Sequence, residues 1–269
     1  MTVAHAVRSI VARDVRLPTP NAPNDRGFHE GRAFWLWLPT SEPPWPGMVI
    51  LHGAGSSKES HADFGRSCAA NGWAAISYDQ RGHGESTDEM GPAALGDVGR
   101  MAALLARREG VDPRRICVRG SSMGGYLAIH AAATERRLAG AIAICPASEE
   151  GLRRGLRDGL FEMRVDVDSF DAWLSEHDLR EAVAELSPKP LILLHARGDE
   201  RVPYAWSEEL YARAGSADAS KLVILPGGHH RSVQHDPEMQ AMALRWLGRA
   251  LERGPSTGRR SPGQEGARD

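Results

Sequence analysis

Six short apolar runs, separated by segments with helical periodicity, constrain the fold of this chain more than any other feature. The runs are nearly continuous in apolar character and lie at 48–51, 74–78, 116–118, 141–144, 191–194 and 222–225. Continuous apolar runs, without polar alternation, are typical of strands in a parallel sheet that is covered on both faces. Between two of them, Val98, Met101 and Leu105 recur at the spacing of one helix face. The pattern predicts an α/β fold with a mostly parallel, doubly wound sheet.

The two ends of the chain follow other patterns. Two strand-like runs, 9–17 and 32–38, follow one another without a helix, so we expect an antiparallel start to the sheet. The tail at 254–269 lacks large apolar side chains, and we expect it to be disordered. We expect residues 1–253 to form a single domain. Within it, the segment 148–187 mixes charged residues with scattered large apolar ones, which is typical either of a surface connection or of a small helical lid.

Charge and cysteine content exclude several classes of partner. The 33 Lys and Arg residues against 35 Asp and Glu residues provide no excess of positive charge for nucleic acid or an anionic membrane. No apolar stretch approaches the roughly 20 residues of a membrane span, and the N-terminal region lacks the apolar core of a signal peptide. Cys68, Cys117 and Cys145 are too few and too scattered for a disulfide framework or a Cys-rich metal site. We expect a cytoplasmic protein without cofactor, metal, nucleic-acid or membrane partner.

One motif carries a candidate nucleophile. The strand at 116–118 is followed by GSSMG at 120–124, which fits G-x-S-x-G, and then by a helix-compatible run. A sharp strand-to-helix turn projects the central Ser hydroxyl, and the flanking glycines tolerate the crowding. The helix N-terminus points its free N–H groups toward the same place. The motif therefore predicts Ser122 as a nucleophile, and the alternative is a Gly- and Ser-rich turn without chemistry.

Two further motifs follow the neighbouring strands. HGAG at 52–55 comes directly after the run 48–51, and a Gly-rich turn there can supply a backbone donor to an oxyanion. DQRGHGES at 79–86 follows the next strand. In this order and spacing the three motifs resemble HGxG, DxRGxGxS and GxSxG of the α/β-hydrolase superfamily of serine esterases and lipases, over about 48–251. The resemblance implies an α/β-hydrolase fold, with the backbone N–H groups of Ala54 and Met123 as the oxyanion hole.

The same resemblance implies a catalytic acid after the run 191–194. HARGDERVP at 195–203 is similar to the hGxxDxxVP loop of the family, which makes Asp199 the acid. The sequence departs from that pattern at Ala196, where Gly is usual. Glu200 is the adjacent competitor, and the alternative role of Asp199 is that of a helix-capping or turn residue.

A histidine base is implied after the last apolar run, in PGGHHR at 226–231. Family members commonly place it four residues after the Pro that ends this strand, which selects His230 and leaves His229 as the alternative. A metal site formed by His229, His230, His235 and Asp236 is the competing interpretation by residue type.

These residues together predict a serine hydrolase that cleaves carboxylic esters or related acyl bonds of a small-molecule substrate. Ser122 attacks the acyl carbon while His230 takes its proton, Asp199 orients the imidazole, and water hydrolyses the acyl-enzyme. The alternatives on the same triad are a thioesterase, an acyltransferase and a small-peptide hydrolase. From another class, a non-catalytic ligand-binding protein could share the fold. The resemblance also places the segment 148–187 where this fold inserts a lid over the nucleophile.

Overall fold

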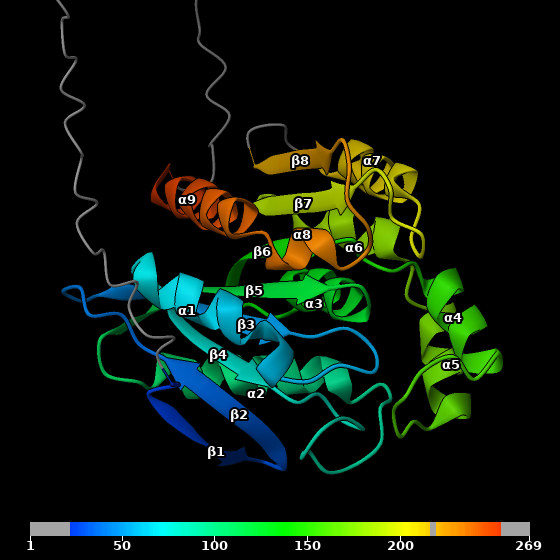
Figure 1. Ribbon diagram of the computed structural model, residues 1–269, viewed down its shortest axis with the longest axis horizontal. Helices are drawn as coiled ribbons and strands as arrows, with labels where there is room; N and C mark the ends of the chain where they lie inside the picture. The colour runs from blue at the N-terminus through cyan, green and yellow to red at the C-terminus, as the bar shows by residue number, and fades with distance from the viewer. Residues whose placement is uncertain (1–21, 216–218, 254–269) are drawn as a thin grey trace, which may run out of the picture.

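The computed structural model describes residues 22–215 and 219–253, and an eight-stranded sheet forms its centre (Figure 1). The strands are β1 (Asp25–His29), β2 (Arg32–Trp37), β3 (Trp45–Leu51), β4 (Ala74–Tyr78), β5 (Val111–Ser121), β6 (Leu138–Ile144), β7 (Leu191–Ala196) and β8 (Ser220–Leu225). Their order across the sheet is β1-β2-β4-β3-β5-β6-β7-β8. The strands from β3 to β8 pair in parallel, whereas β2 pairs antiparallel with both β4 and β1. The predicted mostly parallel sheet with an antiparallel start is therefore confirmed.

The apolar runs of the sequence lie in the strands from β3 to β8 because both faces of the sheet are covered. In β3, Val49 and Leu51 pack into the apolar core on one face, and Met48 and Ile50 pack into the core on the other. Two layers of helices cover these faces, which is why no position of the strand is polar.

The antiparallel start uses a different strand from the one expected. The run at 32–38 corresponds to β2, but its partner is β1, Asp25–His29. In β1, half-buried positions alternate with exposed ones, so this edge strand has no continuous apolar run that the sequence could reveal. The strand expected at 9–17 and the tail at 254–269 both lie outside the described residues.

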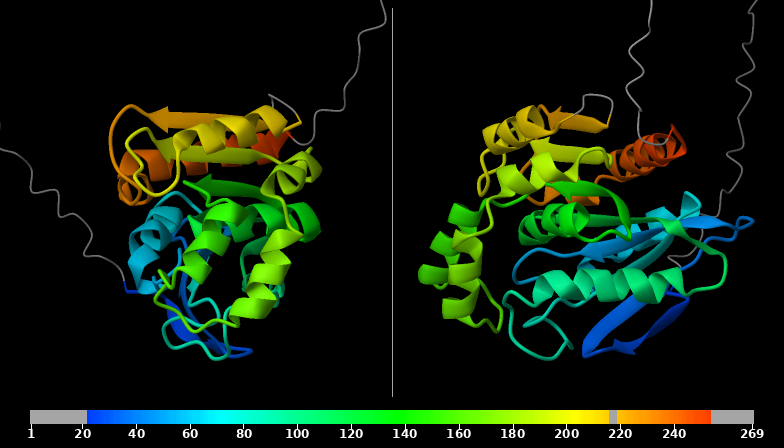
Figure 2. Two further views of the ribbon diagram at one scale, coloured as in Figure 1. Left: turned by 90° about the vertical axis from the view of Figure 1, so that its right-hand side faces the viewer. Right: turned by 180° about the vertical axis from the view of Figure 1, so that it is seen from behind.

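Helices cover the sheet on both faces (Figures 1 and 2). One face carries α1 (Ala62–Ala70), α8 (Ser232–His235) and α9 (Pro237–Arg253). The other carries α2 (Ala94–Ala106), α3 (Met123–Thr134), α6 (Leu179–Leu186) and α7 (Tyr204–Arg213). Within the two described ranges, no helix has the length and hydrophobicity of a membrane span.

The segment 148–187, hereafter the cap segment, folds into α4 (Glu149–Arg157), α5 (Val167–Ser175) and α6. Ser148 and Asp166 cap the first two helices by accepting hydrogen bonds from backbone N–H groups three residues ahead. An ion pair between Arg153 and Asp171, 2.9 Å long, joins α4 to α5. Both helices lie at the carboxyl ends of the parallel strands (Figures 1 and 2), where the loops with the candidate site residues also lie.

Candidate active site

Ser122 occupies the sharp turn between β5 and α3. Its backbone has φ +54° and ψ −120°, a conformation that costs a residue other than glycine about 1–3 kcal/mol. Three hydrogen bonds hold the turn: the Ser122 N–H donates to the Ile144 carbonyl at 2.9 Å, and the Ser122 carbonyl accepts from Tyr126 N at 3.0 Å and Ala147 N at 3.1 Å. The turn therefore keeps a serine, rather than a glycine, in the left-handed region of backbone conformation.

The two glycines of the serine motif are required by close approach. A Cβ atom on Gly120 would lie 1.9 Å from the Gly124 carbonyl oxygen, and one on Gly124 would lie 2.4 Å from the His52 carbonyl oxygen. A Cβ atom on Gly53 would lie 3.4 Å from Cβ of Ser122. The loop at 52–55 thus packs directly against the serine turn.

Two backbone N–H groups beside Ser122 are available to a ligand. Ala54 lies in the loop that contacts Ser122, and its N–H donates to no protein group in the described part of the chain. Met123 is the first residue of α3, so its N–H has no acceptor within the helix. The next N–H of the loop, that of Gly55, is already used, because it donates to Nε2 of His83 at 3.1 Å. Ala54 and Met123 are the two residues whose N–H groups the sequence analysis predicts to form the oxyanion hole.

Two buried histidines brace the loop at 52–55. His52 Nε2 accepts from the Gln80 N–H at 3.0 Å, while His83 Nε2 accepts from the Gly55 N–H. The Nδ1 atom of each ring lies 2.8 Å from a backbone carbonyl oxygen, which fixes the proton on Nδ1. Burial lowers the pKa of His52 to about 3 and also lowers the pKa of His83, so both rings are neutral in neutral solution. The two histidines lock the orientation of the loop that carries Ala54.

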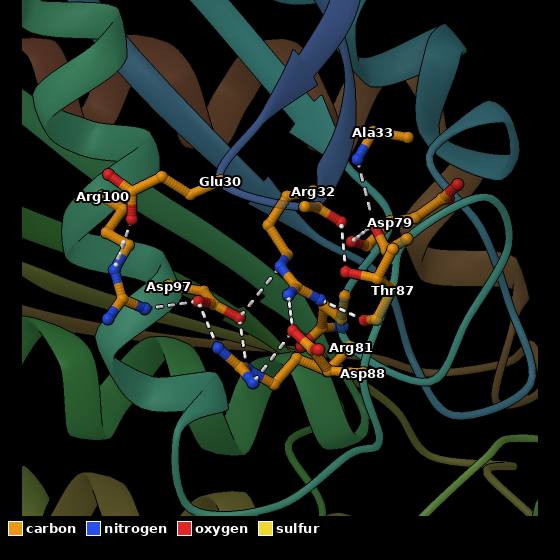
Figure 3. A network of polar contacts seen from close by, with 12 residues as sticks. Glu30, Arg32, Ala33, Asp79, Arg81, Thr87, Asp88, Asp97 and Arg100 are labelled. Atoms are coloured by element: carbon orange, nitrogen blue, oxygen red, sulfur yellow. Dashed lines mark hydrogen bonds and ion pairs between the residues drawn. The ribbon is translucent and has the colours of Figure 1, made fainter.

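An ionic network in turn fixes the loop that carries His83 (Figure 3). Arg32 of β2 and Arg81 both pair with Asp97 of α2, at 3.5 and 2.7 Å, and Arg32 also pairs with Asp88. Arg32 and Asp97 are each only 1% exposed, so the centre of the network is buried, whereas Asp88 lies at its exposed edge. The DxRGxGxS motif therefore acts as a scaffold for the neighbouring HGxG loop.

Asp199 and His230 form a short hydrogen bond, with 2.7 Å between Oδ2 and Nδ1. Asp199 follows β7, and His230 lies between β8 and α8. The Oδ1 atom of Asp199 accepts the N–H groups of Arg201 and Val202, each at 2.9 Å. Burial alone would raise the pKa of Asp199, but hydrogen bonds from His195, from His230 and from these two N–H groups hold it well below its usual range. The carboxylate is therefore ionised and orients the His230 ring.

The two competitors of these residues make different contacts. Glu200 accepts the backbone N–H of His230 at 3.0 Å and makes no contact with the ring. His229 is exposed, and its Nδ1 accepts the N–H of Arg231 at 3.3 Å. Among the described residues, His230 is thus the histidine of this pair that meets the carboxylate.

Cys145 links the serine turn to the Asp199–His230 pair. Its Sγ atom, a carboxylate oxygen of Asp199 and a ring nitrogen of His230 all lie within 4.8 Å of one another. Cys145 directly follows Ile144, whose carbonyl accepts the N–H of Ser122. The serine turn is therefore bonded to the strand end that packs against the Asp199–His230 pair.

These three residues are also the nearest approach to a metal site in the described ranges. Burial and the nearby Asp199 carboxylate raise the pKa of the Cys145 thiol, so it stays protonated and is a poor ligand. The other cluster that the sequence offers is not assembled: His235 instead pairs with Asp63 at 2.9 Å, and Asp236 accepts the N–H of Glu238.

Sequence reasoning missed three residues of this site: His83, Cys145 and His195. His83 lies in the motif DQRGHGES and His195 in HARGDERVP. The motif does not show, however, that His83 accepts a hydrogen bond from Gly55, 28 positions earlier in the chain. Cys145 has a positive φ of 43° at the end of β6, and an apolar run contains no signal of that kind.

The family whose sequence model matches is described as serine aminopeptidase, S33, and the match covers residues 43–164. A relative among curated proteins is the uncharacterized protein YfhR of Escherichia coli O157:H7, which is 26% identical over 192 residues. That alignment covers 68% of this chain and 62% of YfhR, so the chain spans less than two thirds of this relative.

Solved structures with the same fold include two hydrolases. The α/β hydrolase GrgF from Penicillium sp. sh18 has a TM-score of 0.70 and 18% identity, covering 82% of this chain and 94% of GrgF. Est1E from Butyrivibrio proteoclasticus, solved with ferulic acid bound, has a TM-score of 0.66 and 21% identity, covering 85% of this chain and 98% of Est1E. At these identities the likeness concerns the fold.

Proposed function

We propose that this chain, which has the fold of the α/β hydrolases, is a serine hydrolase of carboxylic esters or related acyl bonds. One observation carries the proposal. A strained serine follows β5, and a buried carboxylate that holds an imidazole at 2.7 Å follows β7, so both lie at the carboxyl ends of the strands. The two are linked through the end of β6, because the Ile144 carbonyl accepts the Ser122 N–H and Cys145 lies within 4.8 Å of the Asp199–His230 pair. Serine, aspartate and histidine in this chain order are the triad of the α/β-hydrolase fold.

The proposed reaction proceeds through an acyl-enzyme. Ser122 Oγ bonds to the acyl carbon as His230 Nε2 takes its proton, and the Asp199 carboxylate stabilises the imidazolium that forms. The N–H groups of Ala54 and Met123 donate to the oxyanion of the tetrahedral intermediate. His230 then returns the proton to the leaving oxygen, and the alcohol departs. A water molecule repeats the sequence on the acyl-enzyme, releasing the acid and free Ser122.

A second candidate is hydrolysis of small peptides on the same triad. It is favoured by the printed description of the matching family, serine aminopeptidase, whose model covers 43–164. Thioesters and acyl transfer would use the same nucleophile and base. A non-catalytic ligand-binding protein would need neither a strained serine nor an ionised carboxylate on the histidine ring, and the geometry supports it less.

A substrate panel tests these alternatives. Purified protein is assayed with p-nitrophenyl esters and acyl thioesters of graded chain length and with aminoacyl p-nitroanilides. We expect the highest kcat/KM on an ester and a loss of about 10³–10⁶-fold in Ser122→Ala. Ser121→Ala, one position earlier on the same turn, is the matched control and should retain activity. A higher kcat/KM on the anilides would replace ester with peptide hydrolysis, and equal activity of Ser122→Ala and wild type would refute the nucleophile.

A further inference from the structure

A second histidine contacts the carboxylate of the candidate triad. His195 lies near the end of β7, and its side chain is fully buried. Its Nε2 atom lies 3.2 Å from Oδ2 of Asp199 and 2.9 Å from the Val202 carbonyl oxygen. Its Nδ1 atom lies 2.7 Å from the hydroxyl of Ser207, a buried residue of α7.

These contacts determine where the ring carries its proton. The Val202 carbonyl can only accept, so Nε2 of His195 must be the donor. In the neutral ring Nδ1 then accepts from the Ser207 hydroxyl. The Nε2–H group therefore donates to the Val202 carbonyl, Oδ2 of Asp199 lies 3.2 Å from the same nitrogen, and Ser207 fixes the ring in this orientation.

The two oxygens of Asp199 have different sets of donors. Backbone N–H groups occupy Oδ1, whereas two imidazoles meet at Oδ2, His230 at 2.7 Å and His195 at 3.2 Å. Without His195, the His230 ring would be the single imidazole partner of Oδ2 among the described residues. His195, a residue of β7, contacts Oδ2 of Asp199 from a second direction, in addition to His230.

We propose that His195 is a positioning residue of the candidate triad: its Nε2–H holds Oδ2 of Asp199 in place for His230 and withdraws part of the charge of that oxygen. The proposal rests on the proposed function, because it assigns His195 a role in the same site. It extends the triad by two buried residues, His195 and Ser207, that never touch the substrate.

The proposal predicts a specific shift in the titration of His230. Without the His195 donor, more negative charge remains on Oδ2, and the protonated form of His230 is favoured. Its titration midpoint should rise by about half a pH unit to one unit, and the acidic limb of kcat/KM should move by the same amount. The other titratable groups that face the pair, Glu200 on the His230 backbone and Cys145 beside Asp199, are unchanged by the substitution.

The test combines kinetics with ¹⁵N NMR of histidine-labelled protein. In His195→Leu we expect the upward shift of the His230 midpoint, a fall in kcat on the order of tenfold and a KM within about twofold of wild type. His195→Gln, whose amide N–H can replace Nε2–H, should restore most of kcat and the midpoint. His130→Leu removes a buried histidine that lies far from Asp199 in the sequence and contacts the cap segment, and it should leave the midpoint unchanged.

A folded His195→Leu protein with the wild-type midpoint and kcat would overturn the proposal. If His195→Leu does not fold, Ser207→Ala replaces it: loss of the hydroxyl on Nδ1 should give a smaller shift in the same direction, and no shift would overturn the proposal. The NMR titration does not need turnover. A wild-type protein without activity on any substrate would refute the proposed function, while the His230 midpoint would still decide the role of His195.

Discussion

Ser122 has a positive φ of 54°, a backbone conformation that favours glycine. Surrounding groups support that conformation: the Ile144 carbonyl accepts the Ser122 N–H, and Gly120 and Gly124 allow a close approach of backbone that a Cβ atom would prevent. Strain of this kind persists only where the surrounding structure determines it, and it clusters at functional sites. The backbone therefore fixes the position of the proposed nucleophile before a substrate binds.

At the same scale, the two adjacent histidines should differ in their effect on activity. His230→Ala removes the group that accepts the Ser122 proton, and kcat/KM should fall by about 10³-fold or more. His229→Ala removes an exposed ring whose hydrogen bond, within the described part of the chain, is to the N–H of Arg231, so activity should stay within about threefold of wild type. Steady-state kinetics on the best ester, with circular dichroism as the folding control, measures both. An inactive His229→Ala beside an active His230→Ala would reverse the assignment.

Among the elements, the cap segment joins the site in two ways. An aromatic cluster attaches α5 to α3, in which Trp173 stacks on His177 with 4.2 Å between centroids and lies edge-on to Tyr126. The chain after α4 passes the oxyanion loop, where a Cβ atom on Gly55 would lie 3.6 Å from Cβ of Glu162. The aromatic cluster around Trp173 packs α5 against α3, whereas Glu162 lies against the loop that carries Ala54. We therefore propose that the part of the cap segment after α4 shapes the substrate pocket.

Two substitutions in the cap segment should separate these roles. Phe161→Ala, next to Glu162, should change the ratio of kcat/KM between short and long acyl esters, because it alters the chain that passes the oxyanion loop. Trp173→Ala should instead lower the melting temperature by several degrees, because it removes part of the aromatic cluster. The ester panel and a thermal melt are run on both variants. Unchanged ester ratios in Phe161→Ala would remove the cap segment from substrate selection.

For the molecule as a whole, buried neutral histidines make stability depend on pH. Burial, together with neighbouring His177, lowers the pKa of His130 to about 4, and burial lowers that of His52 to about 3. In the unfolded chain a histidine titrates near pH 6.5. Below that pH the unfolded state binds protons that the folded state does not, so stability falls as pH falls from about 6.5 toward 4. Asp199 has a pKa below its usual range, because its hydrogen bonds outweigh the effect of burial. Its contribution to stability is therefore also lost as pH falls, but only below the pH range in which the histidines act.

Urea unfolding from pH 7 to pH 5 measures this effect. We expect the free energy of unfolding of the wild type to decrease through that window, and the decrease to be smaller in His130→Leu, which has one buried histidine fewer. The Nε2 atom of His130 is buried without a hydrogen-bond partner among the described residues, and the His177 carbonyl beside the ring still accepts the Tyr126 hydroxyl when His130 is replaced. The same slope in both proteins would contradict a neutral, buried His130.

Across the molecule, the sequence predicts what depends on local pattern. The six apolar runs locate the strands from β3 to β8, and the motifs place Ser122 at a strand end and Asp199 and His230 in the loops after β7 and β8. The edge strand β1 could not be predicted, since alternating exposure in a charged pentapeptide resembles any loop. Contacts between separate segments, such as His83 with Gly55 or His195 of β7 with Ser207 of α7, depend on how the fold brings these segments together, and no local pattern encodes them.

Activation of Ser122 by His230 and Asp199 should make this serine reactive toward a covalent serine probe. The protein is treated with a small fluorophosphonate, its intact mass is measured, and the labelled peptide is mapped. We expect one adduct per chain on Ser122 in the wild type and in Ser121→Ala, and none in Ser122→Ala or His230→Ala. An adduct on another residue, or equal labelling of Ser122→Ala and wild type, would contradict the activation of Ser122.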